Sequence, residues 1–464
     1  MYALGHELAQ MPSHKFDLAH MRVLLAALGH PEQKFQSVLI AGTNGKGSTA
    51  ATLASILQAS GLKTGLYTSP HLVRINERIR INGEAIANDD FAGLHDVVDR
   101  AARRLVSEGE LPWHPSFFET LTAMAFEHFA AIQPDLAVLE VGMGGRLDAT
   151  NVVEPRVSVM TDIALDHQKF LGNTIGEIAR EKAGIIRRGG AVVTLPQSPE
   201  ANGAIGNMIL GLGARLVSAV PYVPPVSPGS NSYLAVDVAE GAEQAPRLRF
   251  RYPLQMMGGR IVVDSPLIGR HQLRNIALAI ATAEELHEQG FEQITPAAIE
   301  RGIRDTHWPA RFQVLSESNL RNCGRLDESS ARSYPIRELE YVLDVAHNPA
   351  GAWALRATLA AAYEDRPMTL VFGVMRDKAI AEIAEILFPL AKHIILTHAD
   401  NPRSASPSEI RQAAARVDTD IQEGGDVASA LRQAQELTGP RELIVVTGSI
   451  YVVGEAMRAL GVRA

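Results

Sequence analysis

A glycine-rich segment near the N-terminus has the composition of a phosphate-binding loop. The segment GTNGKGS at 42–48 follows an apolar run and precedes a helical pattern. Backbone N–H groups at a helix N-terminus bind phosphate. We therefore expect Lys46 to reach the terminal phosphates of a nucleotide and Ser48 to offer its hydroxyl to Mg2+. The standard pattern is matched imperfectly, because Gly47 separates the lysine from the serine and Ile40 replaces the earlier glycine. A plain glycine-rich turn is the alternative interpretation.

Further candidate side chains follow in the same half of the chain. Glu140 closes an apolar run, and a carboxylate at the carboxyl end of a parallel strand points into the ligand crevice of a doubly wound sheet. Glu140 and Ser48 suit Mg2+, which prefers oxygen ligands, and His167 could hold a second cation. Lys182 lies in the segment REKAG. Each of these residues could instead be an ordinary solvated or hydrogen-bonded side chain, but their succession after a phosphate loop favours a metal and phosphate site.

The elements that would position these residues alternate between strands and helices. Apolar runs without polar alternation occur at 37–41, 135–141, 156–162 and 191–195, with helical patterns between them. This order is typical of a parallel sheet covered on both faces. Short antiparallel strands are expected at 247–252 and 260–264, followed by a helix at 268–288.

A second strand–helix series begins at 339–345 and continues with strand-like runs at 368–373, 393–397 and 442–447. We predict an α/β protein with an N-terminal P-loop ATPase domain at 1–304, built on a parallel sheet, and a smaller Rossmann-like α/β domain at 305–464. The hinge is expected at 302–311. Residues 221–232 are expected to form a loop, and 318–337 an inserted surface loop.

The composition excludes several classes of protein. The chain has 464 residues, 46% hydrophobic and 21% charged, which is ordinary for a globular chain with a sizeable core. A formal net charge of −8 argues against nucleic-acid binding. The single cysteine, Cys323, excludes an intramolecular disulfide and fits a reducing compartment. Without a signal peptide or an apolar run near 20 residues, we predict a cytoplasmic monomer with no membrane partner.

Several segments together resemble the folylpolyglutamate synthase and dihydrofolate synthase family of the Mur ligase superfamily. GTNGKGS and DVAHNP (344–349) are shared with Mur ligases. Other segments are similar to folylpolyglutamate synthases and are lacking in Mur ligases: TSPHL (68–72), SFFE (116–119), LEVGMGGRLDATN (139–151), TDIALDH (161–167) and REKAGI (180–185). WPARF (308–312) departs slightly from the family pattern, because Ala310 replaces the usual glycine.

The resemblance implies an ATP- and Mg2+-dependent ligase that joins L-glutamate to a pteroate or folate carboxylate through an acyl phosphate. It implies two Mg2+ ions, with Glu140 and His167 as ligands and a carbamylated Lys182 that helps to hold the second ion. Lys46, Lys182 and His347 are the expected catalytic residues. ATP, the co-substrate, is expected to contact Thr43, Asn44, Gly45, Lys46, Gly47, Ser48, Asn275, Arg311 and Asp344.

The same resemblance places the two other substrates. The pterin is expected near Phe117, Phe118 and Asp148, which agrees with the ability of a pterin to stack on aromatic rings and to donate hydrogen bonds to a carboxylate. Glutamate is expected near His347 and Ser449. The resemblance does not decide whether the acid that receives glutamate is dihydropteroate or a tetrahydrofolate polyglutamate, and we expect both to be substrates.

Two other functions are alternatives. A UDP-muramoyl amino-acid ligase would share the phosphate loop and the DVAHNP segment. A non-catalytic nucleotide-binding module would use the same fold without turnover. An activity assay that compares a pteroate with a UDP-muramoyl substrate distinguishes the folate ligase from the UDP-muramoyl ligase. Glutamate-dependent ADP release in the presence of pteroate excludes a non-catalytic module.

Overall fold

The computed structural model describes residues 18–225, 234–237, 247–316, 339–364, 366–417 and 420–462. The insertion predicted at 318–337, with Cys323, lies outside these ranges, as do residues 226–232 of the predicted loop. In the ranges that are described, no helix has both the length and the apolar character needed to cross a membrane.

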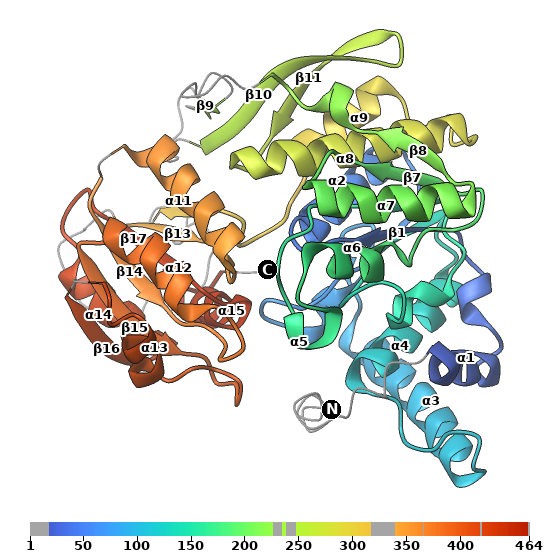
Figure 1. Ribbon diagram of the computed structural model, residues 1–464, viewed down its shortest axis with the longest axis horizontal. Coiled ribbons are helices and arrows are strands. Elements are labelled where there is room, and N and C mark those ends of the chain that lie inside the picture. The colour runs from blue at the N-terminus through green and yellow to red at the C-terminus, as the bar shows by residue number, and fades with distance from the viewer. Residues whose placement is uncertain are drawn as a thin grey trace.

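The N-terminal lobe is built on an eight-stranded sheet (Figure 1). Five strands run parallel in the order β2-β5-β1-β6-β7, and β8 continues this arrangement at one edge. At the other edge, β3 and β4 pair antiparallel. The strands, in sheet order, are β4 (Glu84–Ala85), β3 (Ile79–Ile81), β2 (Thr64–Tyr67), β5 (Leu136–Glu140), β1 (Ser37–Ala41), β6 (Val157–Met160), β7 (Ala191–Thr194) and β8 (Arg215–Ser218).

Helices cover both faces of this sheet because its strands are apolar on both sides. Along β1, Val38 and Ile40 pack on one face, whereas Leu39 and Ala41 pack on the other. The first face carries α2 (Lys46–Ala59), α8 (Arg270–Glu288) and α9 (Pro296–Arg304). The second carries α1 (Leu18–Ala27), α3 (Asn88–Ser107), α4 (Phe117–Ile132), α6 (Ile175–Ala183) and α7 (Pro199–Leu212).

Short elements complete the N-terminal lobe. A three-stranded antiparallel sheet of β9 (Leu234–Asp237), β10 (Arg247–Met256) and β11 (Gly259–Ser265) packs its apolar face on α8 and α9. One short helix, α5 (Gln168–Leu171), follows β6. The single-turn 3-10 helices are η3 (Pro31–Gln33), η4 (Ile75–Arg78), η5 (Ala149–Val152) and η6 (Val220–Tyr222).

The C-terminal lobe is a six-stranded sheet with helices on both faces. Its strands, in sheet order, are β12 (Gln313–Ser316), β13 (Glu340–Leu343), β17 (Leu443–Thr447), β14 (Met368–Phe372), β15 (His393–His398) and β16 (Ile421–Asp426), all parallel except β12. One face carries α11 (Pro349–Tyr363), α12 (Ile380–Leu387), η8 (Phe388–Leu390) and α13 (Pro407–Ala413); the other carries α14 (Val427–Leu437) and α15 (Ile450–Ala459).

The α/β fold class and the expected strands are confirmed, with three corrections. The N-terminal sheet is mixed rather than purely parallel, because β3 and β4 return antiparallel. The helix after the phosphate loop begins at Lys46, inside the segment 42–48 that was expected to precede it, because Gly45 already provides its N-cap. The predicted hinge is shorter at its start, because α9 continues to Arg304.

Candidate active site

One cavity of about 2300 Å³ lies where the two lobes meet. It is lined by the loops that follow β1, β5 and β6 of the N-terminal sheet and by the loops that follow β13, β14, β15 and β17 of the C-terminal sheet. These are the carboxyl ends of parallel strands, where α/β folds bind ligands. All the site residues predicted from the sequence line this single cavity.

The phosphate loop is fixed against both β6 and α8. Thr43 N and Asn44 N donate hydrogen bonds to the carbonyl oxygen of Asp162, at 2.8 and 3.1 Å. Gly45 has φ +90°, and a Cβ at this position would overlap the side-chain oxygen of Asn275 on α8. Because the amides of Thr43 and Asn44 are already used, the amides at the start of α2 are the ones left to bind phosphate.

Two lysine ammonium groups converge on one carbonyl of this loop. Lys182 Nζ lies 2.7 Å from the carbonyl oxygen of Gly42, and Lys46 Nζ lies 3.2 Å from the same atom. Lys182 is 4% exposed. Burial, and then the charge of Lys46, lower the pKa of Lys182 to about 7. Near neutral pH, a large share of Lys182 is therefore an uncharged amine.

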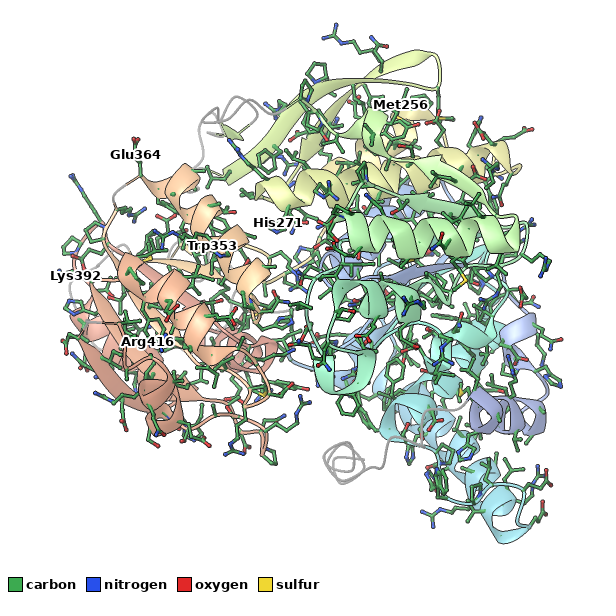
Figure 2. The ribbon with its side chains drawn as sticks, in the orientation of Figure 1. Met256, His271, Trp353, Glu364, Lys392 and Arg416 are labelled. Atoms are coloured by element: carbon green, nitrogen blue, oxygen red, sulfur yellow. The ribbon has the colours of Figure 1, made fainter. Side chains whose placement is uncertain are left out.

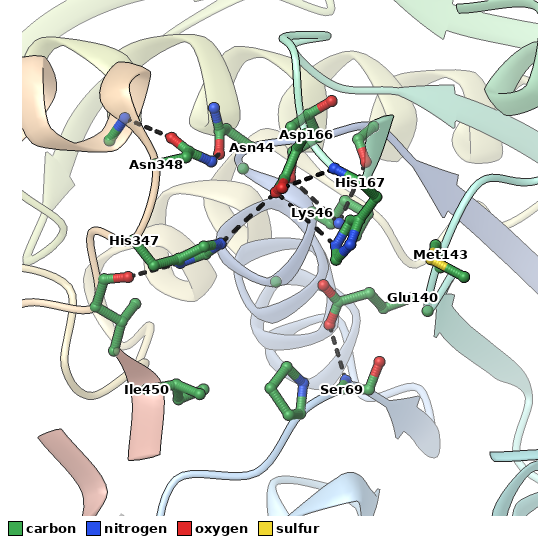
Figure 3. A pocket seen from close by; sticks show the side chains of 18 of the residues that line it. Asn44, Lys46, Ser69, Glu140, Met143, Asp166, His167, His347, Asn348 and Ile450 are labelled. Atoms are coloured by element: carbon green, nitrogen blue, oxygen red, sulfur yellow. Dashed lines mark hydrogen bonds and ion pairs between the residues drawn. The ribbon is translucent and has the colours of Figure 1, made fainter. Parts of the chain in front are cut away.

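Glu140 ends β5 and is buried in the cavity wall. One carboxylate oxygen accepts a hydrogen bond of 3.1 Å from Ser69 N (Figure 3). Burial raises the pKa of Glu140, and the charge of Lys46 opposes this shift. In the part of the chain that the structure describes, Glu140 forms no ion pair with a lysine, arginine or histidine, so its charge is left for another cation.

His167 follows β6 and has a left-handed backbone, with φ 52°. Burial lowers the pKa of His167 to about 4, so its ring is neutral at pH 7 and can offer a lone pair. Within the described ranges, no three His, Cys, Asp or Glu side chains form a cluster that could hold a metal ion.

Polar contacts join the C-terminal lobe to the N-terminal lobe, first at the phosphate loop (Figure 3) and then at Asp166, in the loop after β6. Asn348 caps α11 by accepting from Gly351 N, and its Nδ2 donates to Asn44 Oδ1 at 2.9 Å. Lys378 Nζ lies 2.8 Å from Asp166 Oδ1. The lobes also touch at the entrance, where a Cβ on Gly454 of α15 would overlap the carbonyl oxygen of Leu72.

The geometry of His347 identifies its free nitrogen. Its Nδ1 lies 2.8 Å from the carbonyl oxygen of Val345, which can only accept, so Nδ1 carries the proton. Burial, and then Lys378, lower the pKa of His347. The unprotonated Nε2 lies 3.9 Å from Asp166 Oδ2. These two acceptors lie close enough for one donor group beside them to hydrogen-bond to both.

Two other predicted nucleotide residues lie at the junction of the lobes. The carboxylate of Asp344 accepts from Phe312 N at 2.8 Å and from Ala346 N at 2.9 Å. The Arg311 guanidinium lies 5.9 Å from the ring centre of Trp308. Burial raises the pKa of Asp344 and lowers the pKa of Arg311. Figure 2 shows His271, from the first turn of α8, facing the helices of the C-terminal lobe at the same junction.

The residues predicted to bind pterin and glutamate also line the cavity. Phe117 and Phe118 begin α4, where a capping box of Ser116 and Glu119 fixes the helix start. Asp148 is buried and accepts from Met143 N and from Thr150 N, at 2.9 and 3.0 Å, so it also holds its own loop. Ser449 caps α15, with its Oγ accepting from Tyr451 N at 3.2 Å.

Sequence reasoning did not single out four side chains at or beside the site: Arg78, Asp166 and Lys378 line the cavity, and Glu77 lies next to Arg78 outside the lining. Asp166 lies inside the segment TDIALDH, and Lys378 ends the segment GVMRDK, so both were visible in motifs. Their contact joins positions 212 residues apart, which no local pattern reveals. Glu77 and Arg78 belong to the segment NERI (76–79), for which spacing alone predicts no chemistry.

Glu77 holds the loop that carries Ser69 and His71. Its carboxylate accepts from three backbone amides, Leu72 N at 2.8 Å, Val73 N at 3.0 Å and Arg74 N at 2.5 Å. We expect Glu77→Ala to lower the free energy of unfolding by about 3 kcal/mol, because three part-buried hydrogen bonds to one buried carboxylate are lost. Urea unfolding measures this loss. Glu84→Ala, at an exposed position on β4, is the control, and equal midpoints for the two variants would contradict the prediction.

The comparisons with known proteins agree with this geometry. Residues 330–450 match the family model described as Mur ligase, glutamate ligase domain. The folylpolyglutamate synthase of Lacticaseibacillus casei is 35% identical over 450 residues, covering 95% of this chain and 94% of that protein. The dihydrofolate synthase/folylpolyglutamate synthase of Bacillus subtilis is 31% identical over 445 residues, covering 96% and 94%.

Solved structures match over the same length. The folylpolyglutamate synthase of Mycobacterium tuberculosis complexed with ADP and AMPPCP has a TM-score of 0.80 and 30% identity, and the match covers 100% of this chain and 98% of that chain. A complex described as FPGS-AMPPCP-folate has a TM-score of 0.75 and 31% identity, with 99% of each chain covered.

A phosphate loop that faces a glutamate-ligase lobe across a shared cavity defines an ATP-dependent ligase of the Mur ligase type. More narrowly, the chain belongs to the folylpolyglutamate synthase/dihydrofolate synthase family, whose members are ATP-dependent glutamate ligases. The interpretations as a UDP-muramoyl ligase and as a non-catalytic module are therefore not retained.

Proposed function

We propose that this ligase adds L-glutamate both to dihydropteroate and to tetrahydrofolate polyglutamates. The γ-phosphate of ATP would pass to the acceptor carboxylate, and the glutamate amine would attack the resulting acyl phosphate with release of phosphate. The observation that carries the proposal is the single cavity in which the phosphate loop, Glu140 and His347 meet. Contact between the lobes would exclude water from the unstable acyl phosphate.

The ATP and metal roles follow from this arrangement. The ATP phosphates would lie on the N-terminal amides of α2, with Lys46 and Arg311 stabilising charge on the transferring phosphoryl group. Thr43 and Asn44 would shape the loop, and Asn275 and Asp344 would contact the rest of the nucleotide. Ser48, Glu140 and His167 would hold two Mg2+ ions, which supply charge stabilisation for phosphoryl transfer.

Glutamate would enter from the C-terminal lobe. Its ammonium group could donate to both His347 Nε2 and Asp166 Oδ2 from one side, because both atoms accept hydrogen bonds and lie only 3.9 Å apart. Lys378, on the other oxygen of Asp166, would keep that carboxylate ionised and oriented. Ser449, at the start of α15, would contact a glutamate carboxylate. The pterin would lie near Phe117, Phe118 and Asp148, which line the same cavity.

We also propose that Lys182 is carbamylated. Carbon dioxide reacts with the neutral amine, and the lowered pKa of Lys182, about 7, makes that form abundant at neutral pH. The resulting anion would lie beside the Lys46 ammonium and near the second Mg2+ ion. The change from cation to anion would also remove the repulsion between the two lysines that converge on Gly42.

Carbamylation predicts a dependence of activity on carbon dioxide. Depletion of carbon dioxide should lower kcat by about tenfold or more, and bicarbonate should restore it, because a metal site without its anion loses transition-state stabilisation. At fixed dissolved carbon dioxide, activity should rise as pH increases through 7, where the amine loses its proton. Lys182→Met should show no bicarbonate response. An equal response in wild type and variant would contradict the modification.

Three further proposals concern the domain boundary, the oligomeric state and the location of the protein. We keep the division into domains at 1–304 and 305–464, since α9 ends at Arg304 and the next strand joins the C-terminal sheet. We keep a monomer, because one chain supplies both lobes of the cavity. We keep a cytoplasmic location, because a chain with one cysteine suits a reducing compartment.

A direct assay tests the function. Purified protein is incubated with Mg-ATP and L-glutamate, together with either dihydropteroate or tetrahydrofolate, and both ADP and the glutamylated product are measured. We expect product from both acceptors. Product from one acceptor alone would restrict the proposal to that acid, and ADP release without an amide product from either acid would refute it.

A further inference from the structure

Arg78 is a buried cation with no acidic partner. It ends η4 and is 6% exposed. Its Nε donates to His71 Nδ1 at 3.0 Å, and its guanidinium lies 5.3 Å from the ring centre of Phe117. Among the described residues, no Asp or Glu forms an ion pair or hydrogen bond with Arg78, although the side chain lines the cavity between the lobes.

The nearby carboxylates are already used elsewhere. The three backbone amides of the loop at 72–74 take both oxygens of Glu77. Glu140 accepts from Ser69 N and faces the phosphate loop (Figure 3). Both carboxylates act on Arg78 through their charge, but neither forms a direct ion pair or hydrogen bond with it, so the terminal guanidinium nitrogens keep donors for a ligand in the cavity.

The surroundings of Arg78 are built to hold it in place without cancelling its charge. Burial, and then the charges of Arg78 and Arg458, lower the pKa of His71 to about 4, so this ring is a neutral acceptor. The first turn of α15, with Ser449 and Tyr451, lines the same cavity. A buried, unpaired guanidinium is costly unless a ligand supplies the missing negative charge.

We propose that Arg78 binds a carboxylate of the acyl substrate. A guanidinium fork pairs with a carboxylate through two parallel hydrogen bonds. This inference rests on the proposed function, because it assigns a contact for the acid that receives glutamate. It adds a residue of the N-terminal lobe to the recognition of that acid.

Two carboxylates of the acyl substrate have the required chemistry. One is the carboxylate that receives glutamate, which dihydropteroate and tetrahydrofolate both carry. The other is the α-carboxylate of the terminal glutamate, which tetrahydrofolate carries and dihydropteroate lacks. A kinetic comparison of dihydropteroate and tetrahydrofolate distinguishes these two carboxylates.

The test compares Arg78→Met and Arg78→Lys with Arg80→Met. Arg80 lies two residues away on β3 and carries the same charge. Among the described residues its side chain donates to the carbonyl oxygens of Glu77 and Gly83, and it is not part of the cavity lining. For Arg78→Met we expect KM for the acyl substrate to rise about 30- to 100-fold, because a charge-assisted pair is lost. Arg78→Lys should recover part of this loss, and KM for ATP should stay within about twofold in all three variants.

The KM values of Arg78→Met for dihydropteroate and for tetrahydrofolate show which carboxylate Arg78 binds. A rise in KM for both acids assigns Arg78 to the reacting carboxylate, and a rise for tetrahydrofolate alone assigns it to the α-carboxylate. Values equal to those of Arg80→Met for both acids would overturn the proposal. Because Arg78→Met removes an unpaired buried charge, its unfolding temperature without substrate should not fall below that of wild type, so weak binding is not caused by misfolding.

A binding measurement separates this inference from the proposed function. The affinity of each acid for the protein is measured by calorimetry in the presence of Mg-ADP. Wild-type binding that is weakened by Arg78→Met, without any turnover, would support the inference and refute the ligase proposal. Turnover with unchanged affinity in Arg78→Met would refute the inference alone, and absence of acid binding by the wild-type protein would refute both.

Discussion

Lys46→Met is expected to lower kcat by about 10³-fold with saturating substrates, because one preorganised cation is lost from a phosphoryl-transfer site. Lys46 is the first residue of α2, and its Nζ lies over the phosphate loop, 3.2 Å from the Gly42 oxygen and 3.3 Å from the Thr43 oxygen. Methionine keeps the aliphatic stem and removes the ammonium group. Release of ADP with glutamate and either acid measures the loss.

Part of this effect should be indirect. The charge of Lys46 helps to lower the pKa of Lys182, so its removal should raise that pKa and leave less neutral amine to react with carbon dioxide. Lys46→Met should therefore need a higher pH, or more bicarbonate, for its residual activity. In a double variant with Lys182→Met, the two losses should not add fully.

Lys392→Met is the matched control for Lys46→Met. Lys392 lies just before β15, is half exposed and pairs with Glu442, away from the cavity (Figure 2). Its removal should change kcat by less than about twofold, since exposed ion pairs contribute little. If Lys46→Met retained turnover within about tenfold of wild type, Lys46 would not stabilise the transferring phosphoryl group.

Glu140→Gln is expected to raise the half-saturating Mg2+ concentration by about 30-fold or more and to lower kcat by about 10³-fold. Glutamine retains an oxygen that can accept from Ser69 N, so the loop at 69–74 should keep its position. What it loses is the negative charge at the end of β5. Glu200→Gln, at an exposed position in the first turn of α7, is a control that leaves the cavity unchanged.

Thermal unfolding gives a second measurement for the same variant. Because burial raises the pKa of Glu140 in the folded state, the wild-type protein without metal should lose stability as pH rises through that raised pKa. The glutamine variant does not titrate there, so at pH 8 without metal it should unfold at the higher temperature. Mg-ATP should stabilise the wild-type protein more than the variant, and an equal gain would show that Glu140 does not contact the cation.

The phosphate loop and the central strands could be predicted from the sequence because each depends on a local residue pattern. The run at 37–41 is fully buried and lies directly before the glycine-rich turn, so the strand, the loop and α2 were all predicted within two residues. Residues such as Glu140 and Asp344 end apolar runs, and the ends of parallel strands meet at one edge of a sheet. Their common placement therefore followed from topology alone.

The missed elements have physical reasons. β2 (Thr64–Tyr67) has only four residues, one of them glycine, and all are buried, so it shows no alternation. β16 (Ile421–Asp426) contains two glycines and two acidic residues and is a strand only because β15 supplies its hydrogen bonds. The contacts of Asp166 with Lys378 and of Arg78 with His71 required the folded chain, because each side chain alone is compatible with an ordinary solvated position.

The close approach of Gly454 to the Leu72 carbonyl has a consequence for engineering by recombination. A chimera that takes residues 69–78 from one relative and the final helix from another would juxtapose two backbones that had not been selected to fit. Any side chain at position 454 would force the lobes apart by pushing on the segment that carries Arg78 and Ser69. Exchange of residues 69–78 should therefore succeed only when the residue at position 454 is taken from the same relative.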